Sequence, residues 1–137
     1  MEHRINQEML PAFQGIIPAT LTTTSQDGTP NVTYISQVYQ VDETHVAITR
    51  QFFNKSWRNI SENPKFAVVI TNPENWKTWR LTVTFESEAR EGPVYEEMEM
   101  ILSAIASMQG MSDVFKLESA VICKISAIDV IFHGKGN

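Results

Sequence analysis

The most restrictive feature of this sequence is the order of its patterned segments. Residues 78–85 alternate between apolar and polar side chains, which is the period of a strand with one buried face. Other runs rich in β-branched or apolar residues indicate further strands. Residues 55–62 and 93–109 carry helix signals instead, with Asn63-Pro64 stopping the first helix and Gly92-Pro93 opening the second. The predicted order is three strands, a short helix, two strands, a longer helix and a last strand.

Strands outnumber helices in this order and do not alternate with them regularly, which argues against a parallel sheet built from βαβ units. About six antiparallel strands that close on themselves, with helices flanking the ends, fit better. They are expected at residues 20–25, 31–41, 45–49, 66–70, 78–85 and 121–127. A short helix near residues 5–10 should end at Pro11. The fold class is therefore mainly β with flanking helices, and residues 1–137 are expected to form a single domain.

Composition excludes several classes of partner. The net charge is -5 and no long run of one sign occurs, which argues against nucleic acid and against an anionic membrane surface. The first residues are polar and do not resemble a signal peptide, and no apolar run approaches the ~20 residues of a membrane span. A cytoplasmic location follows as an expectation. The only cysteine, Cys123, lies in an apolar strand-like run, where a thiol behaves as a small buried hydrophobe.

One segment indicates chemistry. A short apolar strand, residues 45–49, leads to a helix start that carries Asn54, Lys55, Ser56 and Arg58. Exposed N–H groups at a helix start favour an anion, and a lysine and a hydroxyl placed there make a plausible phosphate grip. The same residues have a simpler interpretation, in which Asn54 is the N-cap and the basic side chains are solvated.

Other sites are absent or weakly indicated. The glycines form neither a dinucleotide fingerprint nor a phosphate-binding Walker loop. The histidines, His3, His45 and His133, lie far apart and lack ligand spacing to Cys123, so no metal site is expected. No internal nucleophile or general base is apparent, and the catalytic residues are unknown. If the protein does chemistry, a bound cofactor is expected to carry it.

Taken together, four segments resemble the pyridoxamine 5'-phosphate oxidase-related, FMN-binding split-barrel family. The resemblance covers roughly residues 10 to 130, and the order and spacing of the segments are more specific than any one motif. The matching stretches are Ile17-Pro18-Ala19-Thr20-Leu21-Thr22-Thr23-Thr24 with Asp27-Gly28-Thr29-Pro30-Asn31-Val32; Ile35-Ser36-Gln37-Val38-Tyr39 with Val41-Asp42 and His45-Val46-Ala47-Ile48-Thr49; Gln51-Phe52-Phe53-Asn54-Lys55-Ser56 with Asn59 and Asn63-Pro64; and Glu91-Gly92-Pro93-Val94-Tyr95 with Ala104-Ile105-Ala106-Ser107, Gly110-Met111 and Val114-Phe115-Lys116-Leu117.

The resemblance implies a six-stranded antiparallel Greek-key split β-barrel that forms a homodimer with FMN at the interface. The Lys55-Ser56 pair matches the family's phosphate-binding pair, and Arg50 and Asn59 are close enough to join it. Residues 48–51 match the stretch that lines the flavin, and residues 34–36 match the facing strand. Phe53 has two open roles, covering the cofactor or filling the core. The cofactor-binding residues expected from this match are Tyr34, Ile35, Ser36, Ile48, Thr49, Arg50, Gln51, Phe53, Asn54, Lys55, Ser56 and Asn59.

The departures from the family concern the substrate. True pyridoxamine phosphate oxidases carry basic residues on the strand equivalent to residues 31–41, whereas this chain has no Arg or Lys between Pro30 and Thr49. Its C-terminal residues, 132–137, also lack the family's Arg-Leu-rich ending. The phosphate site of the cofactor is therefore expected, and that of a vitamin B6 substrate is not.

The expected function is that of an FMN-dependent oxidoreductase acting on an unknown small substrate or electron donor. Trp76, Trp79 and Arg80 are candidates for the substrate side, although Trp79 fits a core or interface position better. The alternative is a binding module that holds flavin, a deazaflavin or haem without turnover. The sequence does not separate the two, because the expected chemistry resides in the cofactor.

Overall fold

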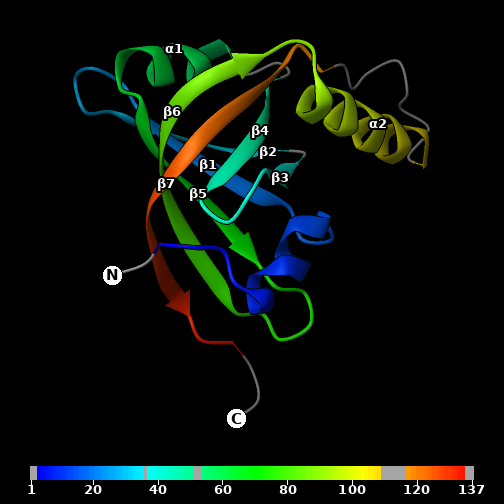
Figure 1. Cartoon of the computed structure of the whole chain (residues 1–137). Helices are drawn as coiled ribbons and strands as arrows, with labels where there is room; N and C mark the ends of the chain where they lie inside the picture. Colours follow the sequence, from blue (N-terminus) through cyan, green and yellow to red (C-terminus); the bar gives the residue numbers. More distant parts are fainter. Residues whose placement is uncertain (1–2, 36, 51–53, 109–116, 135–137) are drawn as a thin grey trace.

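The structure of the chain is a computed structural model that describes residues 3–35, 37–50, 54–108 and 117–134 (Figure 1). Seven strands in these ranges form one sheet. Three helical segments accompany them: the 3₁₀ helix η1 (Gln7–Gln14), α1 (Asn54–Glu62) and α2 (Pro93–Met108). The strands are β1 (Ala19–Thr24), β2 (Pro30–Ile35), β3 (Val38–Gln40), β4 (His45–Arg50), β5 (Lys65–Thr71), β6 (Thr78–Ala89) and β7 (Ser119–Phe132).

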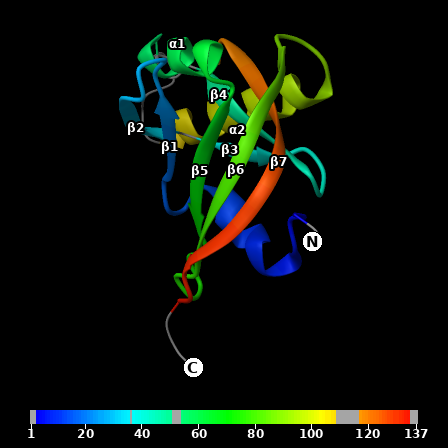
Figure 2. The ribbon, with the colours of Figure 1, turned by 90° about the vertical axis from the view of Figure 1, so that its left-hand side faces the viewer.

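The order of strands across the sheet is β2-β1-β5-β6-β7-β4-β3, and every neighbouring pair is antiparallel. β2 and β3 follow one another in the chain but lie at opposite edges of this order. The chain therefore links the two edges, and the sheet curls into a split barrel (Figure 2). The predicted fold class, mainly β with an antiparallel split barrel and flanking helices, is confirmed.

The strand count differs from the prediction, because the strand expected at residues 31–41 is two strands. Ile35 at the end of β2 and Val38 at the start of β3 are both buried in the same core cluster. In one continuous strand, residues three apart point to opposite faces. Both side chains reach the core because they belong to different strands: Ile35 ends β2, which pairs with β1, and Val38 begins β3, which pairs with β4.

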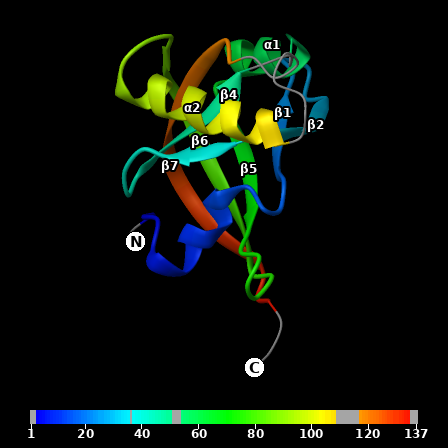
Figure 3. The same ribbon diagram turned by 90° about the vertical axis from the view of Figure 1, so that its right-hand side faces the viewer.

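The core follows the alternation that the sequence predicts for β6. Trp79, Leu81 and Val83 are buried, whereas Arg80 between them is exposed. Cys123 of β7 lies in the same core cluster. A second cluster places Met98 and Leu102 of α2 against residues of β4 and β7, so α2 covers one side of the barrel (Figure 3). This burial of apolar side chains stabilises the barrel at about 25 cal/mol per Å².

The two α-helices lie where the sequence places them, but the N-terminal helix is longer than predicted. η1 continues through Pro11 to Gln14 and ends at Gly15, whose φ is 78°. In a 3₁₀ segment the proline gives up a single N–H donor, and the turn continues. The side chain of Asn6 caps its start by accepting from the Met9 amide. Within the described ranges, no helix has both the length and the apolar content needed to cross a membrane.

The two ends of the barrel differ. α1 covers one end and contacts β1 and β2, whereas the connection between β5 and β6 lies at the other end, beside the end of β7 (Figures 1 and 2). The predicted phosphate site at the start of α1 therefore belongs to the first end, and Trp76 belongs to the second.

Candidate functional site

The end of β4 and the start of α1 form the candidate site. β4 ends at Arg50 and α1 begins at Asn54, so the strand delivers the chain to the helix start as predicted. Gln51 and Phe53 lie outside the described residues, as does Ser36. The backbone of Asn54 and Lys55 belongs to α1, but their side chains are not among those described. The roles predicted for these five residues stay predictions.

Two polar contacts fix α1 on the barrel. Ser56 Oγ accepts a hydrogen bond of 2.9 Å from Asn31 Nδ2 on β2. Asn59 Nδ2 donates a hydrogen bond of 3.1 Å to Thr23 Oγ1 on β1. Ser56, Asn59 and Thr23 are each buried. These side chains hold the helix against the sheet, so the direction in which its first N–H groups point is set by packing.

Arg50 is held from two sides. Its Nη1 donates a hydrogen bond of 2.8 Å to Glu88 Oε2 on β6, and its guanidinium carbon lies 4.1 Å from the centre of the Trp57 ring on α1. Its Nε also lies 3.6 Å from Glu118 Oε2. Trp57 in turn meets Phe85 edge to face, with ring centres 5.7 Å apart. The cation is thus enclosed between a carboxylate and an aromatic face beside the first turns of α1.

Glu88 contacts several of the polar side chains around Arg50, a cluster called the Arg50 corner below that consists of Arg50, Trp57, Glu88 and Ser119. Its side chain receives hydrogen bonds from Arg50 and from Ser119 Oγ at the start of β7, and Arg90 Nη2 lies 3.5 Å away. Burial by itself would raise the pKa of Glu88, but the hydrogen bonds from Ser119 and Arg50 and the charges of Arg50 and Arg90 together lower it. Glu88 is therefore ionised at neutral pH.

The donors at this corner fit a phosphate group. A guanidinium is a preferred partner of phosphate oxygens, and α1, a nine-residue helix, presents its first N–H groups beside it. Thr49 Oγ1 is buried without a hydrogen-bond partner among the described residues, but the alternation of β4 turns it to the face opposite Arg50. These donors come from β4 and α1, the two elements that the sequence singled out.

The remaining predicted residues are spread over the barrel. Ile35 and Ile48 are buried in the core, so their side chains face inward and only their backbone is available to a ligand. Tyr34 is 75% exposed on β2, and Val32 on the same face is 64% exposed. The two make an apolar patch on an edge strand.

Sequence analysis missed the partners of Arg50. Glu88, Ser119 and Trp57 come from three different elements, and Glu88 lies 38 residues from Arg50. No motif joins Glu88 and Ser119 to Arg50, because these residues meet only through the pairing of β7 with both β4 and β6, whereas Trp57 follows Arg50 closely in the chain, on α1. The one available signal is an ionic residue close to the end of a strongly alternating strand, and this pattern also occurs at ordinary solvated strand ends.

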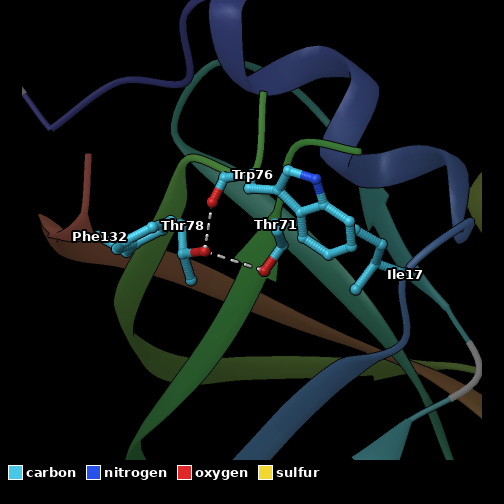
Figure 4. Close-up of a pocket in the computed structure, with 5 residues that line it drawn as sticks. All are labelled: Ile17, Thr71, Trp76, Thr78 and Phe132. Atoms are coloured by element: carbon cyan, nitrogen blue, oxygen red, sulfur yellow. Dashed lines mark hydrogen bonds between the residues drawn. The ribbon is translucent and has the colours of Figure 1, made fainter. Parts of the chain in front are cut away.

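A separate pocket opens at the other end of the barrel (Figure 4). It has a volume of about 640 Å³ and is lined by Ile17, Thr71, Trp76, Thr78 and Phe132. Trp76 is 52% exposed and has a left-handed backbone, with φ of 65°. Its carbonyl accepts a hydrogen bond of 3.0 Å from Thr78 Oγ1, which also lies 3.2 Å from Thr71 Oγ1.

Two further residues proposed for the substrate side have other surroundings. Trp79 is 2% exposed and packs in the core, as its place in the alternating pattern favoured. Arg80 is exposed, and its Nη2 lies 3.7 Å from Asp129 Oδ2 on β7.

Metal-binding and thiol chemistry find no support in the described residues. In these ranges no three His, Cys, Asp or Glu side chains come together as a metal site. Burial, reinforced by the charge of Glu86, raises the pKa of the Cys123 thiol to about 12. His45 lies at the start of β4, with Nδ1 3.0 Å from Asp42 and Nε2 3.1 Å from Glu86.

Comparison with known proteins places this geometry in context. The family model described as pyridoxamine 5'-phosphate oxidase matches residues 5–124 of the chain. An uncharacterised protein of Methanocaldococcus jannaschii is 27% identical over 128 residues, which cover 91% of this chain and 79% of that protein.

Solved structures share the fold at low sequence identity. An FMN-binding protein from Syntrophomonas wolfei superposes with a TM-score of 0.74 at 18% identity, over 94% of this chain and 89% of that one. HupZ from group A Streptococcus gives 0.69 at 21% identity, over 96% and 99%. An F420 reductase gives 0.62 at 15% identity, over 91% and 98%, and HutZ, the haem storage protein of Vibrio cholerae, gives 0.54 at 16% identity, over 96% and 97%.

Proposed function

The chain belongs to the pyridoxamine 5'-phosphate oxidase family, and from this membership we propose that it is a flavoprotein that binds FMN non-covalently at the start of α1. The observation that carries the proposal is the position of Arg50. Its guanidinium is fixed 4.1 Å from the Trp57 ring, beside a helix start that presents N–H groups. The FMN-binding protein of S. wolfei, which has the same fold, supports the choice of cofactor.

When bound, the flavin would supply hydride or electron transfer, and the protein would supply position and electrostatics. Lys55, Ser56 and Arg50 are proposed to hold the phosphate, with Asn54 and Asn59 ordering the helix start. The backbone of residues 48–51 and of residues 34–36 is proposed to line the flavin, and Phe53 to cover it. The buried side chains of Ile35 and Ile48 keep these backbone segments in place.

We propose that the protein is a cytoplasmic homodimer with FMN at the interface. The exposed Val32 and Tyr34 on β2 are an apolar surface that a second subunit can bury. A dimer also gives a role to the pocket beside Trp76. That pocket lies at the end of the barrel opposite α1, so it can meet a flavin bound at α1 only from the partner subunit (Figure 1).

The proposed reaction is oxidation or reduction of a small substrate other than a vitamin B6 phosphate. β2 and β3 carry no Lys or Arg, so the described strand surface beside Tyr34 offers no cation for a second phosphate. NADH and NADPH are tested as electron donors in the experiment below.

The test begins with the absorption spectrum of the purified protein. Flavin bands, and tighter binding of FMN than of riboflavin by titration calorimetry, are the expected result. Stopped-flow mixing with NADH or NADPH then separates a flavoenzyme from a flavin carrier, because only the former should be reduced and reoxidised during turnover. Protein that binds neither FMN nor riboflavin would refute the proposal.

A second candidate is a binding module for a deazaflavin or haem. The shared fold with an F420 reductase and with a haem storage protein favours it. Haem is the less suited of the two to this site, because His45 begins β4 rather than ending it and both of its ring nitrogens contact carboxylates. Titration of the apoprotein with F420 and with haemin, alongside FMN, decides among the three.

A further inference from the structure

The pair formed by Arg50 and Glu88 has a consequence for the proposed FMN site. A carboxylate beside a phosphate site should weaken binding, because two anions repel. Glu88 is nevertheless half-buried, 2.8 Å from the one described cation at the end of β4. Its charge is therefore either a cost to phosphate binding or the means by which Arg50 is held in position.

The surroundings of Arg50 favour the second alternative. The side chains of Arg50 and Glu88 are 20% and 19% exposed, so neither is freely solvated. Nη1 is bound to Glu88, and the face of the guanidinium is covered by Trp57. Arg50 cannot turn away without leaving the Glu88 carboxylate half-buried and without its main partner, which is costly. Among the described residues no hydrogen bond is made by Nη2, which leaves this nitrogen for a ligand.

Glu88 is itself held in place. It belongs to β6, one residue before the strand ends, and Ser119 Oγ of β7 donates to the same carboxylate oxygen that binds Arg50. Ser119 on β7 therefore holds Glu88 in place, and Glu88 in turn holds Arg50 beside the start of α1. Glu118 is a second carboxylate near Arg50, but it is held less closely than Glu88: it is 55% exposed and lies 3.6 Å from Arg50 Nε.

We propose that Glu88 is a positioning residue for the phosphate of the bound cofactor: by holding Arg50 against Trp57, it directs the guanidinium toward the phosphate, and Ser119 supports it. The inference rests on the proposed function, since it requires a phosphate at the start of α1. The gain from orientation exceeds the repulsion between the carboxylate and the phosphate.

The experiment compares two substitutions that remove the same charge. Glu88→Gln and Glu118→Gln each delete one negative charge near Arg50, so repulsion alone predicts that both tighten FMN binding. The measured quantity is the ratio of riboflavin to FMN dissociation constants, which isolates the phosphate. We expect Glu88→Gln to lower this ratio by roughly tenfold, the scale of coupling between groups in one network, and Glu118→Gln to leave it unchanged or raise it.

Three further variants test whether Glu88 acts through Arg50 and is supported by Ser119. Ser119→Ala changes no charge and should lower the ratio in the same direction by a smaller factor. Arg50→Gln should lower it, and Arg50→Gln combined with Glu88→Gln should lower it no further, because Glu88 acts through Arg50. Thermal melting of each variant reports the fold separately, and Ser119→Ala keeps the test available if Glu88→Gln does not fold.

The possible outcomes are distinct. If the wild-type protein binds FMN no more tightly than riboflavin, the proposed phosphate site is wrong and the inference falls with it. If the wild type prefers FMN but Glu88→Gln and Ser119→Ala keep that preference, only the positioning role is wrong. Equal losses in Glu88→Gln and Glu118→Gln would also refute it, because the effect would then not depend on the hydrogen bond that distinguishes Glu88 from the more exposed Glu118.

Discussion

Asn59 on α1 donates a buried hydrogen bond of 3.1 Å to Thr23 Oγ1 on β1. Both residues are at most 2% exposed, so their polar side chains have little access to water and hydrogen-bond to each other instead. It fixes the distance of α1 from the barrel, and with it the position of the helix start that carries Lys55.

Loss of this contact should destabilise the fold. Asn59→Ala leaves the Thr23 hydroxyl buried without its partner, and we expect the free energy of unfolding to fall by about 1–3 kcal/mol. Denaturant unfolding measures the change. Ser61→Ala is the control on the same helix, since Ser61 is exposed and, among the described residues, its hydroxyl donates only to the backbone carbonyl of Trp57; the substitution should change stability by less than ~0.5 kcal/mol. Equal effects of the two substitutions would show that the buried pair contributes nothing specific.

Lys55→Ala should weaken FMN binding by about 1–3 kcal/mol, the scale of a charge-assisted hydrogen bond to phosphate. Riboflavin, which lacks the phosphate, should bind the variant and the wild type equally. Lys65→Ala is the matched control, because Lys65 is an exposed lysine at the start of β5, beyond the far end of α1. An unchanged FMN affinity in Lys55→Ala would place the phosphate elsewhere.

The proposed dimer predicts two chains and two FMN molecules per particle in sedimentation experiments at micromolar concentration. Val32→Asp should shift this equilibrium toward monomer, because it places a charge in the exposed apolar patch beside Tyr34. Gln7→Glu, at an exposed position of η1, serves as the control for charge alone. A flavin-loaded monomer would remove the shared site and the role of the Trp76 pocket across the interface.

Pyridoxamine 5'-phosphate and pyridoxine 5'-phosphate should not be oxidised efficiently. Each brings a second phosphate next to the flavin, and a desolvated dianion needs its own basic partners. Arg80, a candidate for such a partner, is exposed and lies beside Asp129 on β7. The measurement follows peroxide or pyridoxal phosphate formation with FMN-saturated protein. Turnover on the order of ~1 s⁻¹ would contradict the prediction and would direct attention to Arg80.

Stability should fall at alkaline pH through Cys123. The thiol has an ordinary pKa of 9.0, and burial raises it to about 12 in the folded protein. Between these values the unfolded chain loses the proton while the native chain keeps it, so the free energy of unfolding decreases as pH rises. Below pH 9 the effect is absent. The measurement is the stability difference between the wild type and Cys123→Ala, which should change above pH 9; a constant difference up to pH 11 would show that the native thiol ionises normally.

Local pattern predicted most of the fold. The alternation in residues 78–85 gave the buried face of β6 correctly, and Asn63-Pro64 and Pro93 marked the helix ends where they occur. Local pattern did not show that residues 31–41 divide between two edges, because alternation tells which face a residue takes and not which strand it pairs with. Pro11 was misjudged, since a 3₁₀ segment tolerates it.

For the candidate site too, local sequence predicted some residues, and others meet only in the folded chain. The helix start, Arg50 and Ser56 were visible as a cluster in sequence, because β4 and α1 are consecutive. The role of Ser56 and Asn59 in holding α1 was not, since their partners Asn31 and Thr23 lie on other strands. Glu88 was invisible for the same reason, as it meets Arg50 only when β7 joins β4 to β6.

This position of β7 bears on how the protein is made. A ribosome adds residues from the N-terminus at about 5–20 per second, and β7, at residues 119–132, is the last of the described strands to emerge. Until then the nascent chain can form the ladder β2-β1-β5-β6 and the separate pair β4-β3, but nothing joins them in the sheet. Ser119 is also missing, so the Arg50 corner cannot be completed. A product that ends before β7 would therefore hold two unjoined sheet fragments with open edges.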